Sequence, residues 1–216
     1  MTNQAVIVTY VVGQRRRAGR RGDTLLRMPS TVPLAETLSP DGLTLLTQLG
    51  AAASRHGVRL WLVGGAVRDA LLGKHVLDID LTSEMPAGEL GPLLAKKAGG
   101  QVVSRSEFGT VKLRFGGRTL DLATARSERY TRPGALPTVS PGTMDADLAR
   151  RDFSIHAMAA SLAPEGFGEL LDTQNGLEDL QRGSIRVLHE CSFQDDATRM
   201  LRAVRYAVRL GFRLER

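Results

Sequence analysis

Cysteine and long apolar runs are scarce in this sequence of 216 residues. The single cysteine, Cys191, excludes an internal disulfide framework and fits a reducing compartment such as the cytoplasm. No apolar run approaches the roughly 18 residues that a membrane-spanning helix needs. At residues 1–17 the apolar part precedes the charges, which is the wrong order for a secretory signal. These absences predict a cytoplasmic protein without a membrane span.

Net positive charge is scarce outside the N-terminal part of the chain. The formal net charge is +6, but residues 1–27 contain six arginines and one aspartate, a net charge of +5, which leaves +1 for residues 28–216. We interpret residues 1–39 as a basic, mostly irregular extension. Its arginines could bind RNA phosphate groups, or they could belong to a tail or to an extension upstream of a second possible start at Met28.

The most informative stretch reads LWLVGGAVRDALLGKHVLDIDLTSE at residues 60–84. An apolar run predicts a buried strand at 60–63, which ends at Gly64 and Gly65 before a helix at 66–72. A glycine turn that opens a helix offers backbone N–H groups to a phosphate. The stretch therefore predicts a phosphate-binding turn.

Three aspartates form the first group of candidate site residues. Asp78 and Asp80 occupy alternate positions of the second apolar run, and residues two apart on a strand point to the same side. Asp121 begins the alternating stretch DLATA and can point from another strand into the same site. Three such carboxylates can hold two Mg²⁺ ions for an in-line phosphoryl transfer. For the DxD tripeptide alone a solvated strand end is the alternative, but the glycine turn before it favours the metal site.

Arginines form the second group. Arg68 lies one helical turn after the glycine pair and could approach a triphosphate, or could be an exposed arginine paired with the neighbouring aspartate. Arg150 and Arg151 could grip phosphate oxygens, while Asp152 could accept from a ribose hydroxyl or fix an arginine. The alternative for Arg150, Arg151 and Asp152 is a network of ion pairs with a structural role. We expect His156 to be a hydrogen-bonded structural residue, because no second histidine or cysteine lies near it.

The third group is a ridge near the C-terminal end. Asp196, Arg199 and Arg202 are spaced by three, hence along one face of a predicted helix, and Arg205 continues the ridge. A carboxylate and a guanidinium held edge-on could match the donor and acceptor edge of a nucleobase. The alternative is a solvated face held by salt bridges between residues three apart.

The remaining elements follow from periodicity and turn residues. We expect further helices at 40–56, 86–98, 177–181 and 195–210, strands at 101–104, 110–115, 119–124 and 169–171, and a loop at 131–144. Asp145 or Asp147 is the expected N-cap of a helical segment that runs through Arg150 and Arg151. The helix at 195–210 carries an apolar stripe of Leu201, Val204, Ala207 and Val208.

Five motifs together resemble one family. LVGGAVRDALLGKHVLDIDLTSE, LDLATARSERY, ARRDFSIHAMA, GLEDLQRGSIRVL and DDATRMLRAVRYAVRLGF, from about Leu60 to Phe212, are similar to class II tRNA nucleotidyltransferases (CCA-adding enzymes) and bacterial poly(A) polymerases. The resemblance implies an α/β (α+β) fold, a DNA polymerase β-like nucleotidyltransferase head with a mixed, mostly antiparallel sheet. It places this head at residues 40–172 and the start of a helical neck at 173–216. The family's remaining neck, body and tail, which hold the tRNA, are expected to be missing.

The resemblance also implies roles for individual residues. It makes Asp78, Asp80 and Asp121 the catalytic Mg²⁺ ligands. It assigns nucleotide binding to Gly64, Gly65, Arg68, Arg150, Arg151, Asp152, Asp196, Arg199, Arg202 and Arg205, with Asp196 and Arg199 reading the base of ATP or CTP. Two positions depart from the family pattern: His156 stands where Asn is usual, and Ala197 where Pro is usual.

The implied function is template-independent addition of CMP or AMP from CTP or ATP to a tRNA 3′ end. A 3′-hydroxyl would attack the α-phosphate, and pyrophosphate would leave. Poly(A) synthesis and A-only addition share these motifs and remain alternatives. The stretch SFQDDATR slightly favours enzymes that add A. A truncated head that binds nucleotide or RNA without turnover is another alternative. A small-molecule nucleotidyltransferase is a further one, although it leaves the ridge unexplained.

Overall fold

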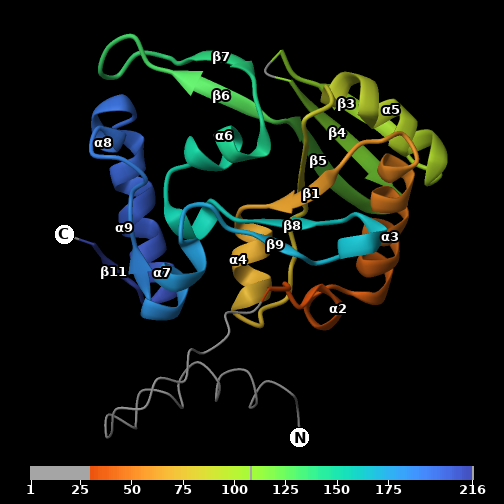
Figure 1. Ribbon diagram of the computed structural model, residues 1–216, viewed down its shortest axis with the longest axis horizontal. Coiled ribbons are helices and arrows are strands. Elements are labelled where there is room, and N and C mark those ends of the chain that lie inside the picture. Colours follow the sequence, from red (N-terminus) through yellow and green to blue (C-terminus); the bar gives the residue numbers. More distant parts are fainter. Residues whose placement is uncertain (1–29, 108, 216) are drawn as a thin grey trace, which may run out of the picture.

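The computed structural model describes residues 30–107 and 109–215 as an α+β fold around one seven-stranded sheet (Figure 1). The strand order is β3-β4-β5-β2-β1-β8-β9, and every neighbouring pair is antiparallel except β2 and β5. The predicted mixed, mostly antiparallel sheet is therefore confirmed. The arginines of the predicted basic arm at 1–27 lie outside the described residues.

The elements have the following bounds. The main sheet contains β1 (Leu60–Val63), β2 (Asp80–Ser83), β3 (Gln101–Arg105), β4 (Thr110–Phe115), β5 (Arg118–Thr124), β8 (Ala159–Ser161) and β9 (Leu170–Leu171). Two small sheets pair β6 (Arg126–Arg129) with β7 (Thr138–Pro141) and β10 (Ser184–Ile185) with β11 (Arg213–Leu214). The α-helices are α2 (Leu34–Thr37), α3 (Pro40–Ser54), α4 (Gly65–Leu71), α5 (Ala87–Lys97), α6 (Met144–Ala149), α7 (Gly176–Arg182), α8 (Ser192–Asp195) and α9 (Thr198–Leu210), and the 3₁₀ turns are η2 (Ser154–His156) and η3 (Pro164–Gly166).

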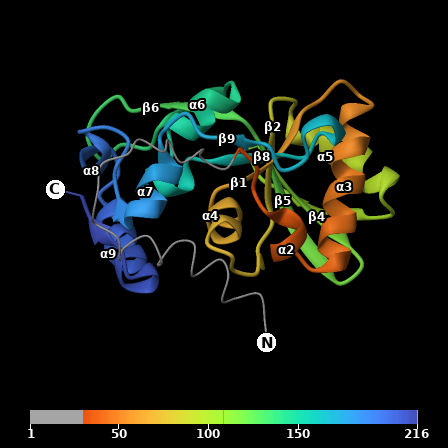
Figure 2. The same ribbon diagram turned by 60° about the horizontal axis from the view of Figure 1, so that its bottom comes forward.

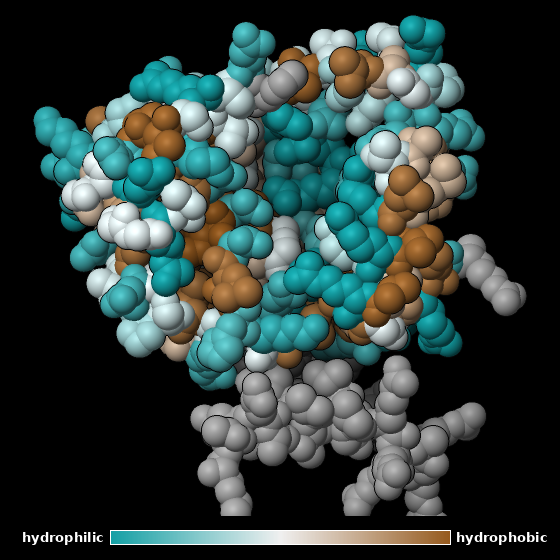
Figure 3. Space-filling view, turned by 180° about the vertical axis from the view of Figure 1, so that it is seen from behind, coloured by the Kyte–Doolittle hydropathy of each residue, from teal (hydrophilic) through white to brown (hydrophobic). Residues whose placement is uncertain are grey.

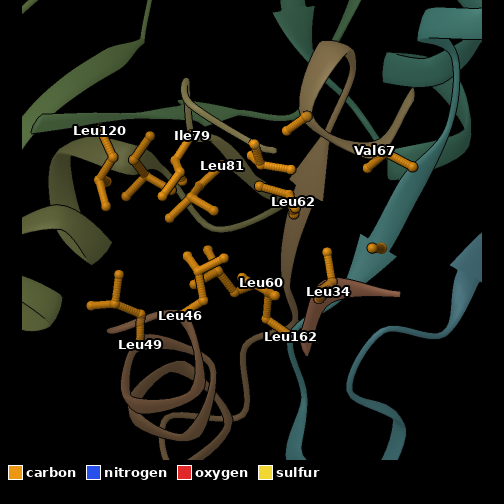
Figure 4. Close-up of a cluster of buried hydrophobic side chains, with 14 of the residues drawn as sticks. Leu34, Leu46, Leu49, Leu60, Leu62, Val67, Ile79, Leu81, Leu120 and Leu162 are labelled. Atoms are coloured by element: carbon orange, nitrogen blue, oxygen red, sulfur yellow. The ribbon is translucent and has the colours of Figure 1, made fainter. Parts of the chain in front are cut away.

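One face of the main sheet is apolar because alternate strand residues point to it. Leu62 on β1 lies opposite Leu81 on β2, and both are fully buried. Leu46 and Leu49 of α3 pack against this face, as Figure 4 shows. At α3 the backbone of Gly50 approaches Leu162, the residue after β8, so closely that an added Cβ would lie 1.8 Å from the Leu162 carbonyl oxygen. The large side chains of this face form the main core.

The opposite face carries the polar residues of the same strands. Val63, the residue after the buried Leu62, belongs to a smaller cluster with Met144 and Leu148 of α6. The strand positions that alternate with the core leucines on β2 and β5 are Asp80 and Asp121. This alternation places the predicted carboxylates on the face away from the main core.

Three local predictions need correction. Residues 30–39 are not simply irregular, because they form α2, whose Leu34 is buried in the main core. Asp78 precedes β2 and is not part of the strand, although it is exposed like Asp80. The N-cap of α6 is Thr143, whose hydroxyl accepts from Ala146 N, so neither predicted aspartate is the cap.

The helix predicted at 195–210 is confirmed as α9, but it begins at Thr198 and is separated from the short helix α8. Asp196 has an extended backbone (φ −140°, ψ 99°) between α8 and α9, and its carboxylate accepts hydrogen bonds from Thr198 N at 2.8 Å and Thr198 Oγ1 at 2.6 Å. A short polar side chain can accept a hydrogen bond from the backbone N–H of the residue two positions later. Such a side chain interrupts one helix and starts the next. The helices α7, α8 and α9 gather at the end of the molecule away from α3 and α5 (Figure 2). The domain boundary at residue 172 stays a prediction.

Of the apolar stripe predicted on α9, only Ala207 packs against the main core, and the other three residues are exposed. Leu201, Val204 and Val208 are 75%, 56% and 81% exposed. The buried residues of α9 are instead Arg199 and Ala203. None of the helices formed by residues 30–107 and 109–215 has the length and apolar character that a membrane-crossing segment needs.

Candidate functional site

A cavity of about 870 Å³ lies on the polar face of the sheet. The ends of β1, β2 and β5, the first turn of α4, the β6–β7 hairpin and α9 contribute to its walls. Seen from behind, the molecule is hollowed where hydrophilic side chains gather (Figure 3). Most of the predicted site residues line the cavity: Gly64, Gly65, Arg68, Asp78, Asp80, Asp121, Arg150, Arg151, Asp152, Asp196, Arg199 and Arg202.

The carboxylates form a row across the sheet. Asp80 opens β2 and lies in register with Asp121 on the parallel strand β5. On the far side of Asp121, Lys112 of β4 is its register partner, with Nζ 2.6 Å from Asp121 Oδ1. Desolvation raises the pKa of Asp80, and the negative charges of Asp121 and Asp78 raise it further, against the lowering effects of Arg151 and Lys112. Like charges therefore converge at one wall of the cavity.

A bound cation would reduce this repulsion, so the donor set is chemically suited to Mg²⁺. Among residues 30–107 and 109–215, however, no three His, Cys, Asp or Glu side chains are already arranged as a metal site. The ammonium group of Lys112 is instead paired with Asp121. The magnesium site stays a prediction.

The glycine turn has a conformation that requires glycine. Gly64 has φ +68° and ψ −126°, in a region that L side chains rarely adopt. A Cβ on Gly64 would also lie 2.9 Å from Arg151 Nη1. The turn thus lets one arginine of the cavity come close to the start of α4.

Arg68 of α4 is only 3% exposed, and its guanidinium has partners on several sides. Its Nε donates to Asp69 Oδ1 at 2.9 Å, and its Nη2 lies 2.8 Å from the same oxygen. Nη1 contacts Nε2 of His156, and the guanidinium carbon lies 5.6 Å from the ring centroid of Tyr206. The pairing with the neighbouring aspartate is confirmed, but the exposed position that went with it is wrong, because Arg68 is buried in the cavity wall.

Asp147 organises Arg150 and Arg151, a role that sequence reasoning missed. Its buried carboxylate accepts from Arg150 Nη2 at 2.6 Å and from Arg151 Nη2 at 2.8 Å. Arg150 Nη1 also donates to Glu128 Oε1 on β6 at 3.0 Å. Desolvation would raise the pKa of Asp147, but the charges and hydrogen bonds of the two arginines outweigh it and lower the pKa. The carboxylate is therefore held in its charged form beside two cations.

The ridge for which the resemblance predicts base reading is an ion-pair network. Asp152 binds Arg199 Nε at 3.1 Å and Arg202 Nε at 2.6 Å, so it fixes two arginines. Arg202 Nη2 lies 2.7 Å from Asp196 Oδ2, and Arg199 Nη1 donates to Ser192 Oγ at 2.6 Å. The hydrogen bonds from Thr198 and Arg202 lower the pKa of Asp196 despite desolvation, which acts the other way. Asp196 lies before α9, so the prediction that it shares the helix face is wrong, but it still meets Arg202.

Arg205 does not join the cavity lining. Its guanidinium carbon lies 5.4 Å from the ring centroid of Tyr206, and Tyr206 and Arg209 line the cavity instead. A three-residue step turns a helix by about −60°, so a strict spacing of three leaves the face after two steps. The series 199, 202, 206 and 209 follows the helical period, and this period was the signal that could have found Tyr206 and Arg209.

Taken together, the sheet order, the carboxylate row and the arginine-rich wall define the class: an α+β domain in which carboxylates and guanidinium groups line one cavity. Residues 60–186 match the family model described as Poly A polymerase head domain, and the chain belongs to this family.

Relatives and solved structures agree with this assignment. The chain is 50% identical over 159 residues to the A-adding tRNA nucleotidyltransferase of Aquifex aeolicus, which covers 74% of this chain and 19% of that protein. A structure of a CCA-adding enzyme with ATP is 41% identical, with a TM-score of 0.74, over 85% of this chain and 41% of that one. The Thermotoga maritima CCA-adding enzyme complexed with tRNA-CCA is 40% identical, with a TM-score of 0.74, over 86% and 42%. The chain thus spans less than half the length of these proteins.

Proposed function

We propose that this chain is the nucleotidyltransferase head of an enzyme that adds AMP or CMP from ATP or CTP to the 3′ end of tRNA. The observation that carries the proposal is the meeting of two kinds of charge in one cavity. The carboxylate row lies on the sheet, and the arginines of α4 and of the segment after α6 face the same space of about 870 Å³. That volume accommodates a nucleoside triphosphate together with a terminal ribose.

The residues of the cavity would have distinct roles. Asp78, Asp80 and Asp121 would hold Mg²⁺, which when bound supplies activation of the attacking hydroxyl and neutralisation of the leaving oxygen. Arg68 and Arg151 would bind the triphosphate oxygens, because guanidinium groups pair with phosphate through two parallel N–H donors. Both arginines are held by aspartates, so little rotamer entropy is lost when a ligand binds.

Asp196 would read the base. Its Oδ2 is held by Arg202 and its Oδ1 by Thr198, which fixes the direction of the carboxylate without a nucleic-acid template. Arg199, at 2% exposure and bonded to Asp152 and to the carbonyl oxygen of Arg150, would link the base-reading ridge to the phosphate-binding arginines.

The names of relatives support the choice of substrate. The Aquifex aeolicus relative is named for addition of A, and two matched structures carry ATP or tRNA in their names. Among the activities of the family, A addition is therefore the form we favour for this chain, in the cytoplasm, where Cys191 would stay reduced.

The test is incorporation of labelled nucleotide. The 216-residue chain is mixed with Mg²⁺, labelled ATP or CTP, and tRNAs that lack A, CA or CCA. We expect AMP transfer to tRNA lacking A, and loss of transfer in Asp80→Asn. The matched control is Asp145→Asn, because Asp145 is exposed on α6 and lies outside the cavity lining. Asp196→Asn should weaken the preference for ATP over CTP.

Other outcomes distinguish the alternatives. Transfer of both CMP and AMP would identify full CCA addition, and long A tails would identify poly(A) synthesis. Magnesium-dependent binding of ATP without any incorporation would contradict transfer and support a head that binds nucleotide without turnover.

A further inference from the structure

His156 lies between two arginines of the cavity without taking part in the carboxylate row. It ends the short turn η2 and is 9% exposed. Its Nε2 contacts Arg68 Nη1, and its backbone oxygen accepts from Arg151 Nη1 at 3.5 Å. One residue therefore touches both arginines that the proposed function assigns to the triphosphate.

The ring of His156 is packed as well as bonded. Its centroid lies 4.4 Å from that of Tyr206 and 6.1 Å from that of Phe153. Tyr206 also lies beneath the guanidinium of Arg68. The two aromatic side chains fix the plane of the imidazole, and the imidazole in turn faces one end of the guanidinium.

The contact requires an uncharged ring, because a protonated imidazole cannot accept from a guanidinium. Burial lowers the pKa of His156 to about 3, and the positive charges of Arg68, Arg151 and Arg209 act in the same direction. At neutral pH Nε2 is then an acceptor, and the hydrogen of the neutral ring is on Nδ1.

The contact with His156 determines which N–H donors of Arg68 remain for a ligand. A guanidinium has five N–H groups. Within the described residues, Nε and Nη2 face Asp69, and Nη1 faces His156. Two N–H groups remain, one on each terminal nitrogen, and the two partners prevent the guanidinium from rotating. Such a fixed pair of donors suits two oxygens of a phosphate.

We propose that His156 is a positioning residue for nucleotide binding: as a neutral acceptor it fixes the guanidinium of Arg68 for the triphosphate of ATP or CTP. This inference rests on the proposed function. It gives His156, which sequence reasoning treated as structural, a specific effect on ligand affinity. Packing alone does not account for the geometry, because a phenyl ring would fill the same space and leave an N–H of the buried Arg68 without its acceptor.

Two substitutions separate packing from hydrogen bonding. His156→Phe keeps an aromatic ring against Tyr206 but removes the acceptor, whereas His156→Asn keeps an acceptor but loses the ring. By isothermal titration with ATP and Mg²⁺, we expect the Kd of His156→Phe to rise about tenfold or more, since hydrogen bonds to charged groups are strong. We expect the Kd of His156→Asn to stay within about threefold of wild type. The matched control is His189→Phe, because His189 is half-exposed and outside the cavity lining.

A double-mutant cycle identifies Arg68 as the intermediary. In an Arg68→Ala background, His156→Phe should cause no further loss of ATP affinity, whereas a purely structural role would give additive losses. Where His156→Phe fails to fold, nitrogen NMR of the wild-type imidazole replaces it: the Nδ1–H tautomer at pH 7 supports the proposal, and a proton on Nε2 overturns it.

The results also separate this inference from the proposed function. A wild-type chain that binds neither ATP nor CTP would overturn both. A wild-type chain that binds ATP, with His156→Phe binding equally well or with additive losses in the cycle, would overturn the role of His156 alone.

Discussion

Lys112 and Asp121 face each other on β4 and β5, with Lys112 Nζ 2.6 Å from Asp121 Oδ1. Asp80 lies next to Asp121 on the other side, so a cation and two carboxylates follow one another across three strands. Lys112 would therefore compete with a metal ion bound at Asp121. The two side chains are 43% and 40% exposed, which makes the pair weak enough for a divalent ion to displace it.

Removal of Lys112 should strengthen metal binding. Lys112→Met keeps the aliphatic stem and removes the charge, so the affinity of the nucleotide-free protein for Mn²⁺ should rise about two- to fivefold, as expected from an exposed ion pair. Electron paramagnetic resonance of free Mn²⁺ measures this directly. Lys97→Met, at the exposed end of α5, is the control. Unchanged or weaker Mn²⁺ binding in Lys112→Met would show that Lys112 does not compete for the site.

Asp147 should be necessary for both stability and nucleotide binding. Asp147→Asn leaves Arg150 and Arg151 beside a neutral amide, and loss of one partner of a buried ion pair costs about 3 kcal/mol. Urea unfolding should show this loss, and ATP titration should show weaker binding. The control is Asp145→Asn, an exposed position on the same helix, which should leave both quantities unchanged. The cluster is not required if Asp147→Asn matches the control.

Acid should destabilise the protein partly through His156. The pKa falls from 6.5 to about 3 on folding, so between these values the unfolded chain binds more protons than the folded one. Stability is therefore lost as pH falls below about 6.5, by about 1.4 kcal/mol per pH unit from this group. His156→Asn removes that dependence, so between pH 7 and pH 5 it should lose about 2 kcal/mol less than wild type in urea unfolding. Equal pH dependence in the two proteins would contradict the neutral state of the ring.

Local pattern was sufficient to predict much of the sheet. The strand β4 has the predicted bounds, β1 has the predicted bounds, and the alternation along β2 and β5 placed Asp80 and Asp121 on one face. These features depend on strand periodicity and glycine turns, which are determined by residues close together in the sequence. The resemblance to a family added the sheet type, which periodicity could not supply.

The partners of charged residues were less predictable, because they depend on contacts far apart in the sequence. Nothing near Asp147 indicates that Glu128 shares Arg150 with it, or that β6 lies beside α6. The apolar stripe of α9 was misleading for the same reason. Hydrophobic spacing marks a face but not its neighbour, and the face with Arg199 is the one that packs inward.

Substitution by alanine at two glycines should change the stability in opposite directions. In Gly50→Ala the new Cβ meets the backbone carbonyl of Leu162, which cannot rotate away, so α3 must shift from β8. We expect a loss of about 2 to 3 kcal/mol in urea unfolding, as for other overpacked cores. Gly88, in the first turn of α5, has no heavy atom among the described residues within 4 Å of an added Cβ. Gly88→Ala should therefore stabilise by up to about 1 kcal/mol through helix propensity and a less flexible unfolded chain. If Gly50→Ala were as stable as Gly88→Ala, the close approach of α3 to Leu162 would be wrong.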